Sequence, residues 1–462
     1  DTFDWRLYRA GRLLQEKHTA QSRGLQLCTL LEGRPVASVL TTHPPDWPEQ
    51  LPEGSLRTAL LALTEMRVLL PLVRVVSELQ HFRVLNEDAK TVVRLRCERP
   101  RVARSGPDAT EHSLPPRLQL VAMRGYGAEA ATIAALLAAD DRVEVAPHTL
   151  FEASLRAVGR VPGDYSSKLA VPLSAEMTAG QAARLIWQHL LATLEANIEG
   201  TKADLDSEFL HDLRVATRRT RSALSQIKGV LPEPLLADFK ARFGWLGQIT
   251  GPTRDLDVFL LELPRYRAAL PAPLRADLDP LQDFLQRHQA DAQNALRQTL
   301  GSAEFTRLLT DWAALLADWP ASPTAPNAQR PVQVLAAERI WKMFRRILRE
   351  GRAIGPDSPH EDLHELRKSC KKLRYLIEFF SALYPSQQTK PLIKTLKVLL
   401  DNLGQFQDLE VQADKLRAFA AQMQAESASV PLPTLLAMGA LIGDLLARQY
   451  AAREAFASRF AA

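Results

Sequence analysis

Cysteine is scarce in this sequence, which has only Cys28, Cys97 and Cys370 among 462 residues. The three lie far apart, and no two have the spacing of a metal-binding or redox motif. This excludes a disulfide framework and is typical of a reducing compartment, where buried cysteines act as small apolar side chains. Long hydrophobic runs are also lacking, since none approaches the roughly 18 uncharged residues of a membrane-spanning helix. The sequence begins without a basic-then-apolar signal pattern, so we expect a cytosolic protein with no membrane partner.

A strong excess of one charge is lacking as well. Lys and Arg number 58 against 53 Asp and Glu, a net charge of +5, although the sequence pI is about 9.1. Any site for a polyanion must therefore come from local clustering of cations and not from the overall field. The length predicts two or three domains. Because the first residue is Asp1 and not Met, we expect the true start of the chain to be missing.

The first part of the chain, residues 1–165, has the pattern of an α+β domain. Residues 25–31, 69–76 and 91–98 carry β-branched side chains or short-period alternation between polar breaks, which predicts strands. Helical periodicity follows at residues 129–139 and 150–158.

From about residue 174 the pattern becomes helical, and a motif repeats within it. The run that begins at His211 returns at His364, a separation of 364 − 211 = 153 residues, and Gly251 against Gly404 keeps the same separation. A proline- and alanine-rich stretch at 319–331 has the composition of a linker. We therefore predict an all-α domain of two pseudo-repeated antiparallel four-helix bundles. They are the first copy, residues 174–318, and the second copy, residues 332–462.

Basic residues gather on one side of the predicted helices. With about 100° per residue, each of the two repeated motifs has a row of cations opposite its apolar face. The first basic row is His211, Arg214, Arg218 and Arg221, and the second basic row is His364, Arg367, Lys371 and Arg374. The helix before the second row has a third basic row, which is Arg339, Lys342, Arg346 and Arg349. Lys394 and Lys397 form a further pair, three residues apart.

Like charges at this spacing repel by roughly 0.2–0.5 kcal/mol per pair, so something must offset the cost. One explanation is a solvated face whose arginines pair with acids of neighbouring helices. The other is a linear polyanion, which releases counterions when its phosphates are neutralised and which arginine can bind through two oxygens at once. Asp255 and Asp408 also have two interpretations, as helix caps or as groups that orient a histidine or an arginine of the neighbouring helix.

These runs resemble the CHAD family, whose name denotes a conserved-histidine α-helical domain. The resemblance covers about residue 174 to the C-terminus. It rests on His211-x-x-Arg214 with Arg218-Arg219-x-Arg221, Thr250-Gly-Pro-Thr-Arg-Asp-Leu-Asp257, His364-x-x-Arg367 with Lys371-Lys372-Leu-Arg-Tyr375, and Leu403-Gly-Gln-Phe-Gln-Asp408. It implies a pair of four-helix bundles and, as the ligand, inorganic polyphosphate held by cationic helix faces.

Residues 1–165 resemble the CYTH, or triphosphate-tunnel, family through Asp1-Thr-Phe-Asp-Trp-Arg-Leu-Tyr-Arg-Ala-Gly11 and Leu118-Gln-Leu-Val-Ala-Met-Arg-Gly125. That family's catalytic carboxylates lie in a Glu-x-Glu-x-Lys strand, a motif that this sequence lacks. Without carboxylates to hold a divalent metal, little would activate water against a phosphoanhydride. The resemblance therefore predicts a degenerate domain with no catalytic residue, no metal and no cofactor. Arg94, Arg96 and Glu98 share one face of their predicted strand, which leaves phosphate binding open.

The leading hypothesis is a cytoplasmic protein that binds inorganic polyphosphate and is targeted to polyphosphate granules. One alternative is a metal-dependent triphosphatase whose helical part recruits the substrate. A nucleic-acid binder is disfavoured because single-strand binders interleave aromatic side chains for base stacking, and the rows offer only Tyr375. The sequence indicates no oligomeric state. The predicted polyphosphate-binding residues are His211, Arg214, Arg218, Arg219, Arg221, Arg339, Lys342, Arg346, His364, Arg367, Lys371, Lys372, Arg374, Lys394 and Lys397.

Overall fold

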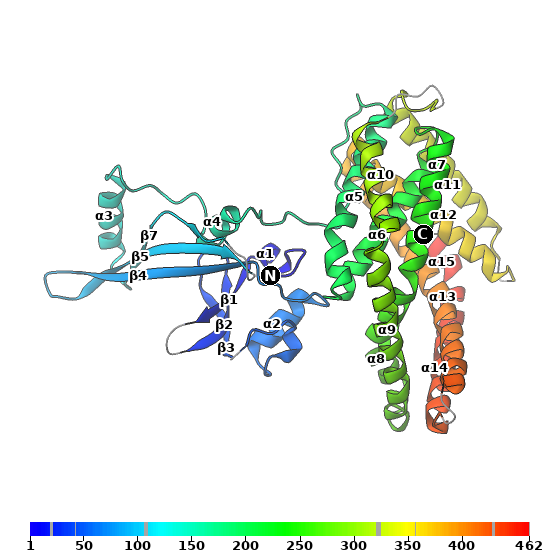
Figure 1. Cartoon of the computed structure of the whole chain (residues 1–462), viewed down its shortest axis with the longest axis horizontal. Coiled ribbons are helices and arrows are strands. Elements are labelled where there is room, and N and C mark those ends of the chain that lie inside the picture. The colour runs from blue at the N-terminus through cyan, green and yellow to red at the C-terminus, as the bar shows by residue number, and fades with distance from the viewer. Residues whose placement is uncertain are drawn as a thin grey trace. The chain divides into compact units, whose positions relative to one another are not determined.

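The computed structural model describes residues 1–18, 22–41, 43–105, 110–319, 325–355, 357–426 and 430–461. The chain divides into two compact units, Asp1–Ser166 and Ser167–Ala462. The strands all lie in the first unit, and the second is built from helices (Figure 1). This order confirms the predicted fold class, α+β followed by all-α. Within the described ranges, no helix is long and apolar enough to cross a membrane.

The first unit contains two antiparallel sheets. The strands of the smaller sheet lie in the order β1 (Arg12–His18), β2 (Arg23–Thr29), β3 (Pro35–Leu40). In the larger sheet, β5 (Thr91–Arg104) pairs with β4 (Val73–Leu85), β6 (His112–Ser113) and β7 (Arg117–Ala122). The helices of this unit are α1 (Arg6–Arg9), α2 (Ser55–Thr64), α3 (Gly127–Ala138) and α4 (Leu150–Ala157). The strand predicted at 69–76 begins later, at Val73.

Each sheet of the first unit has its own apolar core. Leu25 and Leu27 of β2 pack with Leu56 and Leu60 of α2, because alternate residues of a strand point to one face. In the larger sheet, Val93 of β5 packs with α3. Arg94, Arg96 and Glu98 have the opposite parity and therefore share the other face, as predicted. The register places Arg96 opposite both His81 and Gln119.

The helices of the second unit repeat at the separation of the sequence motifs. Helix α6 (Ser207–Gln226) and helix α12 (His360–Phe379) begin 360 − 207 = 153 residues apart. The same difference separates the starts of the other four pairs. These are α5 (Ala179–Lys202) and α11 (Val332–Ala353), α7 (Glu233–Ile249) and α13 (Ser386–Glu426), α9 (Asp279–Leu300) and α14 (Leu432–Glu454), and α10 (Ala303–Ala317) and α15 (Phe456–Ala461).

The copies differ where the first one carries a proline. Helix α8 (Gly251–Ala269) follows α7 directly, whereas α13 continues through the equivalent position as one helix of 41 residues. Pro252 has no backbone N–H to donate to the preceding turn, and Gln405 takes its place in the second copy (252 + 153 = 405). Of the predicted linker, residues 320–324 lie outside the described residues, and Asn327 donates its backbone N–H to the Gly229 carbonyl at 2.8 Å.

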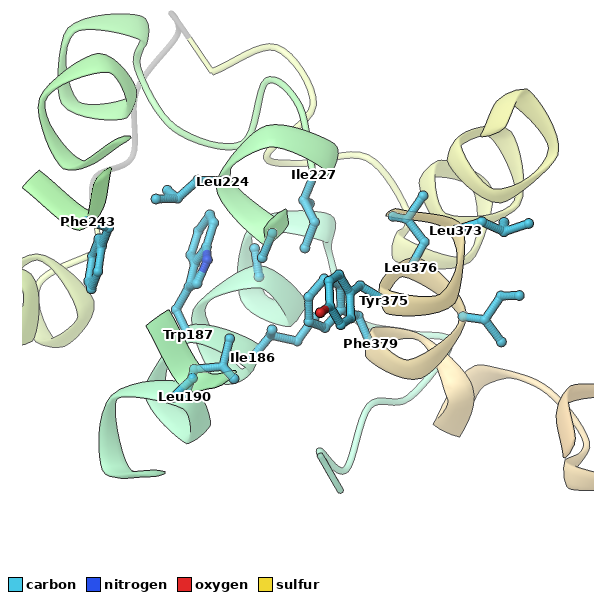
Figure 2. Packing of buried hydrophobic residues seen from close by; sticks show 14 of the residues in the cluster. Ile186, Trp187, Leu190, Leu224, Ile227, Phe243, Leu373, Tyr375, Leu376 and Phe379 are labelled. Atoms are coloured by element: carbon cyan, nitrogen blue, oxygen red, sulfur yellow. The ribbon is translucent and has the colours of Figure 1, made fainter. Parts of the chain in front are cut away.

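The two copies share their hydrophobic cores. The largest cluster combines side chains of α5, α6 and α7 with side chains of α11, α12 and α13. Tyr375 and Phe379 of α12 point toward Ile186 and Ile227 of the first copy (Figure 2). A second cluster joins α8 and α9 with α13 and α14. Burial of these apolar surfaces, the main stabilising term in folding, fixes α6 beside α12.

Candidate functional site

Helix α6 presents the first basic row because its other side is buried. The carboxylate of Asp206 caps the helix by accepting the backbone N–H groups of Glu208 at 2.9 Å and Phe209 at 3.2 Å. Leu213 and Leu224, on the apolar side, are fully buried. Within the row, His211 and Arg214 are half-buried, whereas Arg218 and Arg221 are exposed. The predicted amphipathic arrangement of α6 is confirmed.

Helix α12 repeats this arrangement and lies against α6. Leu366 and Leu376 are fully buried, and all four members of the second basic row are half-buried. Arg218 of the first row donates its Nε–H to the Tyr375 hydroxyl at 2.8 Å. Arg219 pairs with Glu378 at 3.3 Å. The two rows therefore meet at the contact of the copies and form one surface, which we call the joint basic surface.

Lys371 lies where the rows converge. Burial lowers its pKa to about 8, and the positive charges of Arg367, Arg218 and Arg374 act in the same direction. Asp408 is the acid that opposes this shift. Cations from both copies thus lie close enough to disfavour one another's charge.

Glycines of the adjoining helices lie next to the row arginines. A Cβ atom at Gly404 would lie 3.4 Å from the guanidinium of Arg367, and one at Gly251 would lie 3.9 Å from that of Arg214. A Cβ atom at Gly247 would lie 2.9 Å from Arg221. Only at Gly247 would a Cβ atom be too close to its arginine, whereas at Gly251 and Gly404 it would make an ordinary contact.

Asp255 and Asp408 are not helix caps, and that interpretation is wrong. Asp408 lies inside α13, and Asp255 lies inside α8, whose N-cap is Thr250. Asp408 accepts from Arg367 at 3.0 Å, which matches the alternative that it orients an arginine of the neighbouring helix. Asp255 instead pairs with Lys415 of the second copy.

Arg214, the first-copy equivalent of Arg367, is held differently. It donates to the Thr250 hydroxyl at 2.8 Å and to the Gly247 carbonyl at 3.1 Å. Burial lowers the pKa of Arg214; Asp255 opposes this shift, and Arg218 and Arg254 add to it.

The two histidines contact equivalent residues, one on α8 and one on α13. His211 Nδ1 lies 3.2 Å from Arg254, and His364 Nδ1 lies 2.6 Å from the side-chain oxygen of Gln407. Because a guanidinium only donates, His211 Nδ1 is the acceptor in its contact. Arg254 is a site residue that the sequence analysis missed. The sequence could have indicated Arg254 through its spacing, because it follows His211 by 43 residues and Gln407 follows His364 by the same number.

The remaining predicted residues divide into two groups. Arg339 donates to the carbonyl of Gln226 at the end of α6 at 2.8 Å, and burial lowers its pKa. Arg346 pairs with Glu350 at 2.5 Å. Among the described contacts, none joins Arg339, Lys342, Arg346 or Arg349 to the second basic row. Lys372 is half-buried on α12, and Lys394 and Lys397 are exposed on α13.

Lys397 precedes Gly404 by seven residues, or about two turns, so the two residues share a side of α13. Within the part of the chain that the structure describes, no three His, Cys, Asp or Glu side chains come together as a metal-binding group.

Comparison with known proteins assigns the helical unit to a domain family. The sequence model of the CHAD domain matches residues 185–417, half of the chain. The chain is similar to the crystal structure of the CHAD domain from the plant Ricinus communis, with 26% identity, a TM-score of 0.54, and coverage of 64% of this chain and 96% of that one. It is also similar to PptA from Streptomyces chartreusis, with 19% identity, a TM-score of 0.45, and coverage of 61% and 99%. A comparison with curated protein sequences found no match.

Proposed function

This chain belongs to the CHAD domain family, and we propose that it binds inorganic polyphosphate on the joint basic surface of α6 and α12. A CHAD domain is associated with polyphosphate binding. The observation that carries the proposal for this chain is the meeting of the two rows, where Arg218 of α6 contacts Tyr375 of α12 and arginines of both copies act on the charge of Lys371.

Electrostatics favours a ligand with closely spaced charges at this surface. Holding several cations together is unfavourable in the free protein, and one linear anion relieves the repulsion at several residues at once. Arginine suits this role because its planar fork of donors matches phosphate oxygens. A row along a helix repeats every turn, about 5.4 Å, so it follows an extended chain of phosphates more readily than a compact anion.

Burial of Tyr375 favours polyphosphate over single-stranded nucleic acid. Sequence-tolerant binding of single strands relies on exposed aromatic rings on which bases stack. Tyr375 is the aromatic residue of the second-row motif. It is 3% exposed, and its ring packs in the apolar core, where no base can stack on it. We expect the protein to associate with polyphosphate granules in the cytoplasm.

We further propose that the first unit does not catalyse hydrolysis. The competing function is a metal-dependent triphosphatase whose substrate the helical unit recruits. With Mg²⁺ or Mn²⁺, we expect no release of phosphate from tripolyphosphate above the rate without protein. Robust metal-dependent turnover, by this chain or by a form with additional N-terminal residues, would overturn the proposal of a non-catalytic unit.

Replacing the rows tests the binding proposal. In one variant Arg214, Arg218 and Arg221 become Gln, and in the other Arg367, Lys371 and Arg374 become Gln, a residue that keeps most of the length and the helix propensity. Each phosphate contact that is lost should flatten the log–log dependence of affinity on salt by about 0.7. We expect weaker binding and a smaller slope in both variants. Unchanged affinity in both would make the rows ordinary solvated helix faces.

A further inference from the structure

We propose that Lys415 is a positioning residue of the joint basic surface. By binding Asp255, it keeps that carboxylate from neutralising Arg214, so the first copy makes the stronger contacts with the anion. The inference rests on the proposed function, because it concerns how the two rows share one polyanion.

The two copies use equivalent residues in different pairs. Arg367 donates to both carboxylate oxygens of Asp408, at 3.0 and 3.3 Å, so the protein itself neutralises this arginine. In the first copy the carboxylate of Asp255 pairs with Lys415. Arg214 donates its hydrogen bonds to neutral oxygens, those of Thr250 and Gly247. A guanidinium whose hydrogen-bond acceptors are neutral can still form a charge-assisted pair with a phosphate.

Lys415 reaches Asp255 because the two copies share the second hydrophobic cluster. Leu256 and Phe259 of α8 pack there with Leu416 of α13, the residue after Lys415. The rings of Phe259 and Phe419 meet edge-on with their centroids 5.1 Å apart. These contacts fix the facing sides of α8 and α13, so the ion pair joins the two copies.

The first copy has no lysine equivalent to Lys415. The corresponding position in the first copy is Glu262 (415 − 153 = 262), and Glu262 pairs with Arg265 at 3.3 Å. No cation from that position can draw Asp408 away from Arg367. This difference acts together with a second one, since the Thr250 hydroxyl that binds Arg214 has Leu403 as its equivalent (250 + 153 = 403). One arginine is thus bound to an acid and its equivalent to neutral groups.

The charges around Arg214 also favour binding of an anion by the first copy. Asp255 acts on Arg214 as a nearby negative charge, and Arg218 and Arg254 act on it as positive charges, whereas Gln407 replaces Arg254 in the second copy (254 + 153 = 407). Counting cations assigns the larger share of binding to the second copy, which has two basic rows. The pairing of Asp408 with Arg367, and of Asp255 with Lys415, instead assigns the larger share of binding to the first copy.

A double-mutant cycle of Lys415 and Asp255 tests the proposal. We expect Lys415→Gln to weaken polyphosphate binding roughly threefold to tenfold, because Asp255 is released to pair with Arg214. In the Asp255→Asn background the same change should have no further effect. Lys415→Arg, which keeps the charge, should bind like the wild type. Asp408→Asn should strengthen binding, because it frees Arg367.

Equal losses from Lys415→Gln in the two backgrounds would show that Lys415 acts directly on the ligand, and would overturn the proposal. A crystal structure of the Lys415→Gln variant gives an answer that does not require polyphosphate. We expect the Asp255 carboxylate within hydrogen-bond distance of Arg214 in that variant. An Asp255 that stays away from Arg214 would refute the positioning role even if the chain binds polyphosphate, whereas absence of polyphosphate binding by the wild type would refute only the proposed function.

Discussion

Lys371 offers a test of the electrostatics of the joint basic surface without any ligand. Burial and three arginines lower its pKa from 10.5 to about 8. A lysine whose pKa is lower in the folded state is harder to charge there than in the unfolded chain. Above pH 10.5 the lysine is neutral in both states and costs the fold nothing. As the pH falls from 10.5 through 8, the unfolded chain takes up the proton more readily, and the free energy of unfolding decreases. At pH 7 the charged Lys371 destabilises the fold.

The size of the effect follows from the shift. One pKa unit is about 1.36 kcal/mol, so the shift of Lys371 corresponds to at most about 3 kcal/mol, and solvent around a half-buried side chain reduces it to about 1–2 kcal/mol. Lys371→Met removes the charge and keeps an unbranched side chain. We expect the variant to be more stable than the wild type by that amount at pH 7, and the difference to shrink as the pH rises toward 10.

Urea unfolding followed by far-ultraviolet circular dichroism measures this difference, because most of the helices belong to the second unit. Lys372→Met is the matched control, since Lys372 is also half-buried on α12, and we expect it to change the stability little at either pH. A Lys371→Met protein that is less stable than the wild type at pH 7, or a gain that does not depend on pH, would refute the reasoning.

Two further predictions concern the scaffold. Gly200→Ala should lower the free energy of unfolding by about 1–3 kcal/mol, because the new Cβ would lie 2.2 Å from the ring of Phe209. Gly244→Ala, where nothing lies within 4 Å, should instead raise it by about 0.5–1 kcal/mol through helix propensity, and thermal unfolding of the two proteins compares them. Burial, aided by the charge of Asp204, raises the pKa of Asp257 to about 6, so its favourable contribution is lost as the pH rises from 3.8 through 6. Asp257→Asn should therefore be more stable than the wild type at pH 7 but not at pH 4, as urea unfolding at the two pH values would show.

The parts of the site that follow from local periodicity could be predicted from the sequence. The rows on α6 and α12 depend only on about 100° per residue and on which side is apolar, and both were found. The repeat of the helix starts likewise follows from the separation of the motifs. The equivalence of Gly251 and Gly404 was visible, although the arginine that lies next to each glycine was not.

The contacts between the copies could not be predicted in this way. A repeat shows which residues are equivalent but not which helices of the two copies touch. The pairing of Lys415 with Asp255, and the contact of Arg218 with Tyr375, depend on shared cores whose members are far apart in sequence. Arg254 was missed for a related reason, because it lies outside the rows and gains its role through His211 on another helix.

Polyphosphate binding by the joint basic surface is tested most directly by titrating the intact chain with polyphosphate of defined length while single-stranded DNA competes at fixed salt. A surface suited to closely spaced phosphates without base stacking should prefer polyphosphate, so DNA at the same phosphate concentration should displace little of it. Equal competition per phosphate would contradict the account and leave only a generic basic surface on α6 and α12.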